Sequence, residues 1–271
     1  MTFSAKKMIK QRKSVRTFDG KTLSDEDRKN LENYIHVLTN PFEVPVEFCL
    51  LDAKEHQLSS PVIVGEHTYL AAKVKREEHF EIAFGYSFEK ACLYARSLGI
   101  GTVMLAASLS RSAFEKAMNV QEDEVLPVAS PVGYPAEKGS IRENLMRKGL
   151  RADERIAFDE LFFAGSFDKA LTKEAAGEYT EALEMARLSP SATNKQPWRA
   201  VVDGNKVYFY EQKSIKDSIL GDIQKVDVGI ALCHFDLVME ENGVSGRFLF
   251  EDPQIKAPEN VYYIASYERI G

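Results

Sequence analysis

The chain has 271 residues, of which 44% are apolar and 28% are charged, and its formal net charge at pH 7 is −6. This length accommodates one large or two small domains, and the composition is that of an ordinary globular protein. The acidic balance argues against a nucleic-acid partner, because no strongly basic face is available overall.

The N-terminal residues lead into no apolar segment, and no apolar stretch of the sequence is long enough to cross a bilayer. The three cysteines, Cys49, Cys92 and Cys233, are far apart and show neither metal-ligand nor disulfide spacing. Each lies in an apolar run, so we interpret them as buried thiols in a reducing compartment. We therefore expect a cytoplasmic protein without a membrane partner.

The first candidate site segment is basic and spans residues 12–16. It contains Arg12, Lys13, Ser14 and Arg16, a set of donors that suits a phosphate better than a hydrophobic core. If the segment is extended, Arg16 points to the same side as Ser14. The alternative is a solvated basic N-terminus, which is common.

The chain then shows two similar halves. Ser24 and Thr172 each follow a Phe-Asp pair and precede an amphipathic pattern, which predicts two N-capped helices. A second pattern runs from Gly85 to Gly99 and recurs, with the same spacing, from Gly229 to a second terminal glycine. Strands are predicted after each of these helices, at 102–105, 125–129, 248–250 and 261–266.

This repeated order predicts an internal duplication with its boundary near Gly165, which gives halves of 1–165 and 166–271. The fold expected is α+β, with two degenerate repeats that form a pseudo-dimer in one chain. The alternative is a chance similarity between amphipathic helices.

The two halves differ where chemistry is expected. The apolar segment 161–165 stands where the first half has its basic residues, and it cannot bind a phosphate. The segment 190–198 contains Pro190, Ser191, Ala192, Asn194, Gln196 and the single tryptophan, Trp198, whereas the first half has only an Asn-Pro pair there. These absences predict one composite site per chain, built from both halves.

Segment 190–198 combines two prolines that fix the backbone with amide side chains that donate and accept hydrogen bonds. It could be only a capping turn, and we interpret Trp198 as a core anchor. A second loop, with Pro131, Val132 and Gly133, follows a predicted strand, and its glycine would let the backbone approach a planar ligand. A Gly-Tyr-Pro sequence is also common in simple turns.

Segments 12–18, 131–135 and 190–198 resemble three motifs of the nitroreductase family of FMN oxidoreductases. The stretch from residue 159 to residue 198 is similar to a subgroup in which two such halves are fused. The resemblance covers nearly the whole chain, and its most specific motif is segment 190–198. It implies the nitroreductase-like three-layer α+β fold.

The resemblance also implies one non-covalent FMN per chain. Arg12, Lys13 and Ser14 would bind the phosphate and ribityl end, and Arg16 would lie near the N1/C2 edge of the flavin. The backbone at Val132 and Gly133, after Pro131, would face flavin N5. The other half would contribute the residues that cover the dimethylbenzene and ribityl side, namely Pro190, Ser191, Ala192 and Asn194, with Gln196 beside them. Arg155 lies where the family often has a last phosphate-binding residue.

The function expected is an FMN-dependent oxidoreductase that takes electrons from NAD(P)H and passes them to a small electron-poor acceptor. The flavin would carry the chemistry, so we expect no catalytic side chain and no metal, and we interpret His234 as a core histidine. NADH and NADPH stay open because no dinucleotide fingerprint is expected. The alternatives are a non-catalytic flavin protein for storage or sensing, or reductive dehalogenation or enoate reduction on the same fold. The fused halves predict a monomer.

Overall fold

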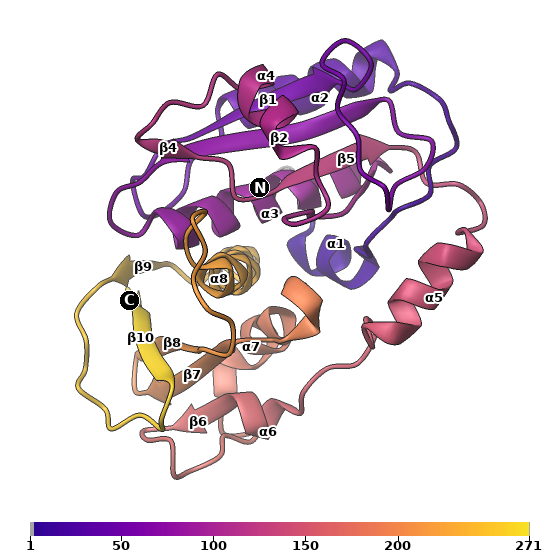
Figure 1. Ribbon diagram of the computed structural model, residues 1–271. Helices are drawn as coiled ribbons and strands as arrows, with labels where there is room; N and C mark the ends of the chain where they lie inside the picture. The colour runs from indigo at the N-terminus through magenta and orange to yellow at the C-terminus, as the bar shows by residue number, and fades with distance from the viewer. Residues whose placement is uncertain (1–2, 271) are drawn as a thin grey trace. The chain divides into compact units, whose positions relative to one another are not determined.

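The structure, a computed structural model, describes residues 3–270 apart from the side chains of Ile141 and Asn144. It divides into two compact units, called here the N-terminal unit (residues 11–80 and 87–152) and the C-terminal unit (residues 3–10, 81–86 and 153–270). Each unit combines helices with a mainly antiparallel sheet, which confirms the predicted α+β class (Figure 1).

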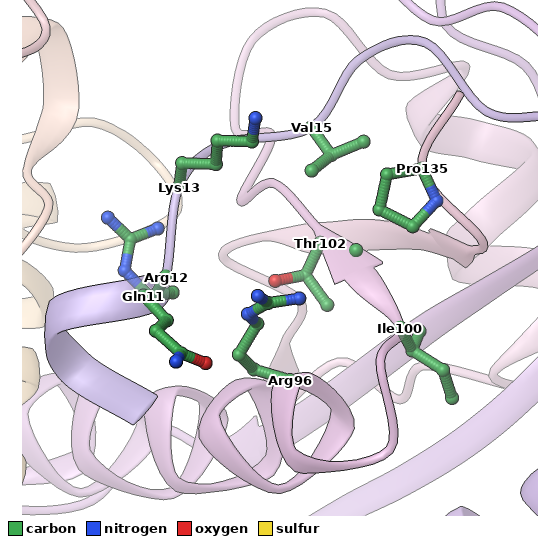
Figure 2. A pocket seen from close by; sticks show the side chains of 9 residues that line it. Gln11, Arg12, Lys13, Val15, Arg96, Ile100, Thr102 and Pro135 are labelled. Atoms are coloured by element: carbon green, nitrogen blue, oxygen red, sulfur yellow. The ribbon is translucent and has the colours of Figure 1, made fainter. Parts of the chain in front are cut away.

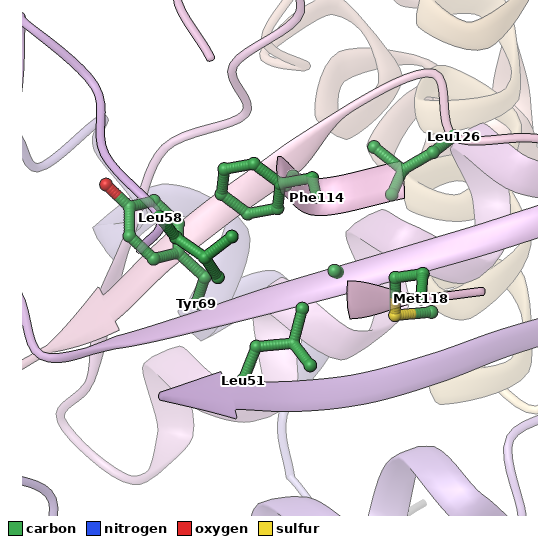
Figure 3. Close-up of a cluster of buried hydrophobic side chains, with 8 residues drawn as sticks. Leu51, Leu58, Tyr69, Phe114, Met118 and Leu126 are labelled. Atoms are coloured by element: carbon green, nitrogen blue, oxygen red, sulfur yellow. The ribbon is translucent and has the colours of Figure 1, made fainter. Parts of the chain in front are cut away.

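The N-terminal unit is built on the sheet order β1-β2-β5-β3, with the short strand β4 also paired to β2. Its strands are β1 (Val46–Asp52), β2 (Thr68–Lys75), β3 (Gly101–Thr102), β4 (Glu124–Val125) and β5 (Ala129–Gly133). Its helices are α2 (Asp25–His36), most of α3 (Phe80–Ser97), α4 (Arg111–Ala117) and α5 (Ile141–Gly149). One core cluster packs Leu51, Tyr69 and Phe114 together (Figure 3).

The C-terminal unit has the sheet order β6-β7-β8-β10-β9, in which only β6 is parallel to its neighbour. Its strands are β6 (Phe162–Ala164), β7 (Trp198–Asp203), β8 (Lys206–Gln212), β9 (Gly246–Leu249) and β10 (Val261–Arg269). Its helices are α1 (Ala5–Gln11), α6 (Phe158–Leu161), η1 (Gly177–Tyr179), α7 (Thr180–Arg187), η2 (Ala192–Asn194) and α8 (Ile223–Glu241). Helix α8 is buried along most of its length and contacts α7 and β8.

The two sheets share one strand order, which supports the predicted duplication in part. We count β4 and β5 as one interrupted strand and leave β6 out. The order β1-β2-β5-β3 then corresponds to β7-β8-β10-β9, so in both sheets the last strand of the chain lies between the second and the third. In both, the long helix connects the second strand to the third, as α3 and α8 do. The predicted boundary near Gly165 falls inside the C-terminal unit, which begins its last stretch at Asp153; the division of the sequence at that residue stays a prediction.

Gly85 and Gly229 lie inside α3 and α8, and the prediction that each begins its helix is wrong. They instead permit a close approach of the two helix backbones within the C-terminal unit. A Cβ built on Gly85 would lie 2.0 Å from the carbonyl oxygen of Val226, and one on Gly229 would lie 2.2 Å from that of Ile82. The two contacts are reciprocal, because each glycine faces a backbone carbonyl group of the other helix.

The predicted helix ends are confirmed in part. The Ser24 side chain caps α2 by accepting a hydrogen bond from the Asp27 N–H group, and both terminal glycines, at 99 and 243, have positive φ. The helix predicted after Thr172 begins only at Thr180, because Gly177 adopts a φ of +55° and interrupts it. Cys49 corrects another prediction: it is exposed on β1, whereas Cys92 and Cys233 are buried as expected.

Candidate functional site

The basic segment at residues 12–16 runs beside β3. Ser14 forms a parallel bridge with Thr102, and the Val15 N–H group donates to the Thr102 carbonyl oxygen at 3.0 Å. A Cβ on Gly101 would lie 2.9 Å from the Val15 side chain, so the glycine allows this close packing against β3. The chain thereby holds the basic residues beside the C-terminal end of α3.

A pocket in the N-terminal unit lies against this segment (Figure 2). Its lining includes Gln11, Arg12, Lys13, Arg96, Thr102 and Pro135. Three of these side chains are cationic and none is acidic. Arg12 and Lys13 were predicted as site residues, whereas Arg96 comes from the last turn of α3 and was not. Figure 2 shows the Arg96 side chain rising from that helix toward Thr102.

Arg12 is matched by a buried acid. Its Nε lies 3.6 Å from Oε1 of Glu89, and the two side chains are 10% and 1% exposed. A buried carboxylate needs a nearby cation, so Arg12 balances the charge of Glu89. Once Arg12 is paired with Glu89, the remaining positive charge of the pocket comes from Arg96 and the exposed Lys13.

Arg16 lies beside α5 and is not among the residues that line the pocket. Its N–H group donates to Glu143 Oε1 at 3.3 Å, and the Thr17 hydroxyl donates to Glu143 Oε2 at 2.7 Å. Burial lowers the pKa of the Arg16 guanidinium, and Glu143 partly offsets this effect. Its buried Nε has no hydrogen-bond partner among the described residues.

The segment predicted as a glycine loop is a buried strand. Pro131, Val132 and Gly133 belong to β5, where Gly133 pairs with Gly101. A Cβ on Gly133 would lie 3.0 Å from the Phe18 ring, so the glycine makes room for that side chain. The proximity of this backbone to a flavin stays a prediction.

Segment 190–198 of the C-terminal unit is a strained turn. Thr193, Asn194 and Gln196 have φ values of 49°, 56° and 49°, in the left-handed region that non-glycine residues seldom adopt. Such strain costs about 1–3 kcal/mol per residue and clusters at functional sites, because the surrounding structure must enforce it. Several hydrogen bonds hold this turn.

The strained turn is fixed mostly by its own side chains and by Arg155. The Gln196 N–H group donates to the Ser191 hydroxyl at 2.8 Å, and Gln196 Oε1 accepts from the Ile156 N–H group at 2.9 Å. Arg155 Nη1 donates to Asn194 Oδ1 at 3.4 Å. The predicted residues Ser191, Asn194, Gln196 and Arg155 are thus brought together, with Pro190 half-buried just before them. Part of the amide capacity predicted for a ligand is used by the chain itself.

A buried acidic group lies behind the turn, and sequence reasoning missed it. The Ala192 N–H group donates to both oxygens of Asp227, at 3.1 and 3.0 Å, and Asp227 is 3% exposed inside α8. Burial, together with Asp222 and Glu211, raises the pKa of Asp227 well above its usual range. The sequence offered only a weak signal, an Asp in the largely apolar stretch 226–233 of α8.

Two structural predictions from this region are confirmed. Trp198 is 1% exposed and begins β7 as a core residue. His234 is fully buried, and its Nδ1 contacts the Ser189 hydroxyl at 2.9 Å and the Met185 carbonyl oxygen at 3.0 Å. Within residues 3–270, acids, histidines and cysteines form no group that could hold a metal ion. None of the helices described there is both long and apolar enough to cross a bilayer.

Comparison with known proteins points to one family. The sequence profile of the family described as "Putative TM nitroreductase" matches residues 4–239. No curated protein matches the chain.

One solved structure shows the same fold over the whole chain, and two others are similar over about half of it. A "putative nitroreductase" from Thermotoga maritima MSB8 superposes with a TM-score of 0.65 at 20% identity, covering 100% of this chain and 94% of the other. An "FMN-dependent Nitroreductase" from Clostridium difficile R20291 gives a TM-score of 0.40 at 13% identity and covers 52% of this chain and 94% of its own. An "FMN and NADPH-dependent nitroreductase" mutant derived from Sphigopyxis sp. strain HMH gives 0.43 at 10% identity, over 52% and 92%.

Proposed function

Because the chain belongs to the family described as "Putative TM nitroreductase", we propose that it is an FMN-dependent oxidoreductase that uses NAD(P)H to reduce a small electron-poor acceptor. The observation that carries this proposal is the pocket lined by Arg12, Lys13 and Arg96, whose positive charge exceeds what Glu89 balances. A flavin mononucleotide phosphate carries a charge of about −1.5 to −2 near neutral pH, which matches this excess.

The residues present suit such a cofactor in two further respects. Buried guanidinium Nε atoms of Arg12, Arg16 and Arg96 have no hydrogen-bond partner among the described residues, and anionic oxygens are the partners they favour. The strained turn at residues 193–196 is held in place by surrounding hydrogen bonds, as expected for a preformed binding element.

In this proposal, Arg12, Lys13 and Ser14 bind the phosphate and ribityl end, and Arg16 donates to the pyrimidine edge. We further propose that segment 190–196 and Arg155 are contacts of the cofactor, as the sequence resemblance implies, and that Val132 and Gly133 offer backbone groups. Bound FMN would supply hydride acceptance and electron release. The chain's own residues bind and orient the cofactor and supply positive charge where negative charge accumulates.

The decisive experiment is an FMN titration of the purified protein, followed by flavin fluorescence and absorbance. We expect saturation at one FMN per chain. Lys13→Ala and Asn194→Ala should each weaken binding by about tenfold or more, since each removes a donor to the cofactor. Lys13 is preferred to Arg12 as a target, because removing Arg12 would leave the buried Glu89 without its cation. Lys116→Gln, an exposed change at the end of α4, serves as the control.

The outcomes separate the alternatives. Two FMN per chain would contradict a single composite site, and no binding would remove the oxidoreductase proposal. If FMN binds, anaerobic addition of NADH or NADPH should bleach its absorbance. A flavin that binds but is never reduced would instead indicate a storage or sensing protein.

The proposal also includes a monomer, since one chain would supply the whole site. Size-exclusion chromatography with light scattering should give the mass of one chain with FMN bound. A mass of two chains with one FMN between them would contradict it.

A further inference from the structure

The side chain of Arg96 has no role in the site proposed from sequence motifs. It extends from the last turn of α3 into the pocket beside Gln11 and Thr102 (Figure 2). Its Nε is buried and has no hydrogen-bond partner among the described residues. A buried donor left unsatisfied is costly, so a ligand that accepts from it would recover free energy.

The charges around the pocket favour a doubly negative ligand group. Arg12 is balanced by Glu89, and the described contacts give Arg96 and Lys13 no acidic partner. Two cations in excess match a phosphate monoester more closely than a carboxylate, which carries a single charge. The guanidinium is also planar and can donate two parallel hydrogen bonds to phosphate oxygens.

The second half of the chain supports the same assignment. Aligning Gly85 with Gly229 also aligns Gly99 with Gly243, and it places Glu240 of α8 opposite Arg96. The half with an apolar segment in place of the basic one thus has an acid at this position. If Arg96 served only to stabilise the end of α3, we would not expect a cation in the half with the basic segment and an acid in the half without it.

We propose that Arg96 binds the phosphate of FMN together with Lys13, and that this contact makes the chain prefer FMN to riboflavin. The inference rests on the proposed FMN function and adds a phosphate ligand from α3. Riboflavin is the natural probe for it, because it has the same ring and ribityl chain but no phosphate.

A purely structural role for Arg96 makes a different prediction. A cation in the last turn of a helix interacts favourably with the helix dipole. Losing that interaction would weaken the unit and affect both flavins alike. The ratio of FMN affinity to riboflavin affinity therefore separates the two roles.

The test titrates FMN and riboflavin into wild type, Arg96→Gln, Arg96→Lys and Lys116→Gln. Lys116 is a matched control, since it is a cation in the last turn of α4 that does not line the pocket. Arg96→Gln should weaken FMN binding by about tenfold to a hundredfold and change riboflavin binding by less than about twofold. The FMN affinity of Arg96→Lys should lie between those of wild type and Arg96→Gln, while its riboflavin affinity should not change. Lysine keeps the positive charge but lacks the paired N–H donors of the guanidinium group.

Equal losses for both flavins, or no loss for either, would overturn the assignment while leaving FMN binding intact. If the Gln variant does not fold, Arg96→Lys decides the matter, and an unchanged FMN-to-riboflavin ratio in that variant would overturn it. Failure of wild type to bind either flavin would instead remove the proposed function, and the assignment with it.

Discussion

The stability of the C-terminal unit should fall as the pH rises through neutrality, and the carboxyl group of Glu211 should contribute to this fall beside that of Asp227. Glu211 on β8 is 1% exposed, and its Oε1 has no hydrogen-bond partner among the described residues. Burial and the neighbouring Asp222 raise its pKa to about 7, against the opposing influence of Lys213 and Lys225. The folded unit therefore favours the protonated form of this group.

The sign and size follow from linkage. A carboxyl group whose pKa is raised on folding contributes stability that is fully present below its unfolded value, about 4.3, and is lost as the pH rises toward its folded value. Each pKa unit of difference corresponds to about 1.4 kcal/mol. Only the part of this loss that falls between about pH 5 and 8 is measured, and we expect it to be about 1–3 kcal/mol.

Trp198 provides the assay, since it is the single tryptophan and lies directly opposite Glu211 in the β7–β8 register. Urea unfolding followed by its fluorescence at pH values from about 5 to 8 should show wild type losing stability as the pH rises. Glu211→Gln cannot ionise and should make this dependence shallower than in wild type, whereas the exposed change Glu259→Gln should leave it as in wild type. Identical slopes in wild type and Glu211→Gln would refute the reasoning.

Two further changes test residues of α8, one for packing and one for a hydrogen bond. Gly229→Ala places a Cβ 2.2 Å from the Ile82 carbonyl oxygen, so the helices must separate, and we expect a loss of about 2–4 kcal/mol in urea unfolding. Gly149→Ala meets nothing within 4 Å and should be neutral or slightly stabilising; equal effects would contradict the contact. Asp227→Ala removes the acceptor of the Ala192 N–H group and should weaken FMN binding about tenfold, whereas Asp227→Asn keeps an oxygen there and should weaken it less. Equal FMN affinity in the Ala variant and wild type would show that this hydrogen bond does not position the turn.

Sequence patterns predicted those features that depend on a few neighbouring residues. The cap at Ser24 and the buried Trp198 both follow from local residue types. Arg96 was missed because it is one arginine in an amphipathic helix, and only the pairing of Ser14 with Thr102 brings the basic segment to it.

Other errors have the same origin in tertiary packing. Residues 131–133 were predicted as a loop because proline and glycine usually mark turns, but pairing with β2 and β3 makes them a strand. The helical patterns were predicted to follow Gly85 and Gly229, yet both glycines lie inside their helices, where the close backbone contact requires glycine. A sequence pattern does not contain these contacts.

The two long helices differ at positions that support the proposal of one FMN per chain. The alignment that puts Glu240 opposite Arg96 also puts Ala83 opposite Asp227, the acid that accepts from the strained turn. Each helix thus keeps the polar group that serves the motif of its own half and lacks the other. The reciprocal glycines, whose role is packing, are present in both. The glycines that serve packing thus occur in both helices, whereas the polar residues proposed for binding occur once, which agrees with the proposal of one FMN per chain.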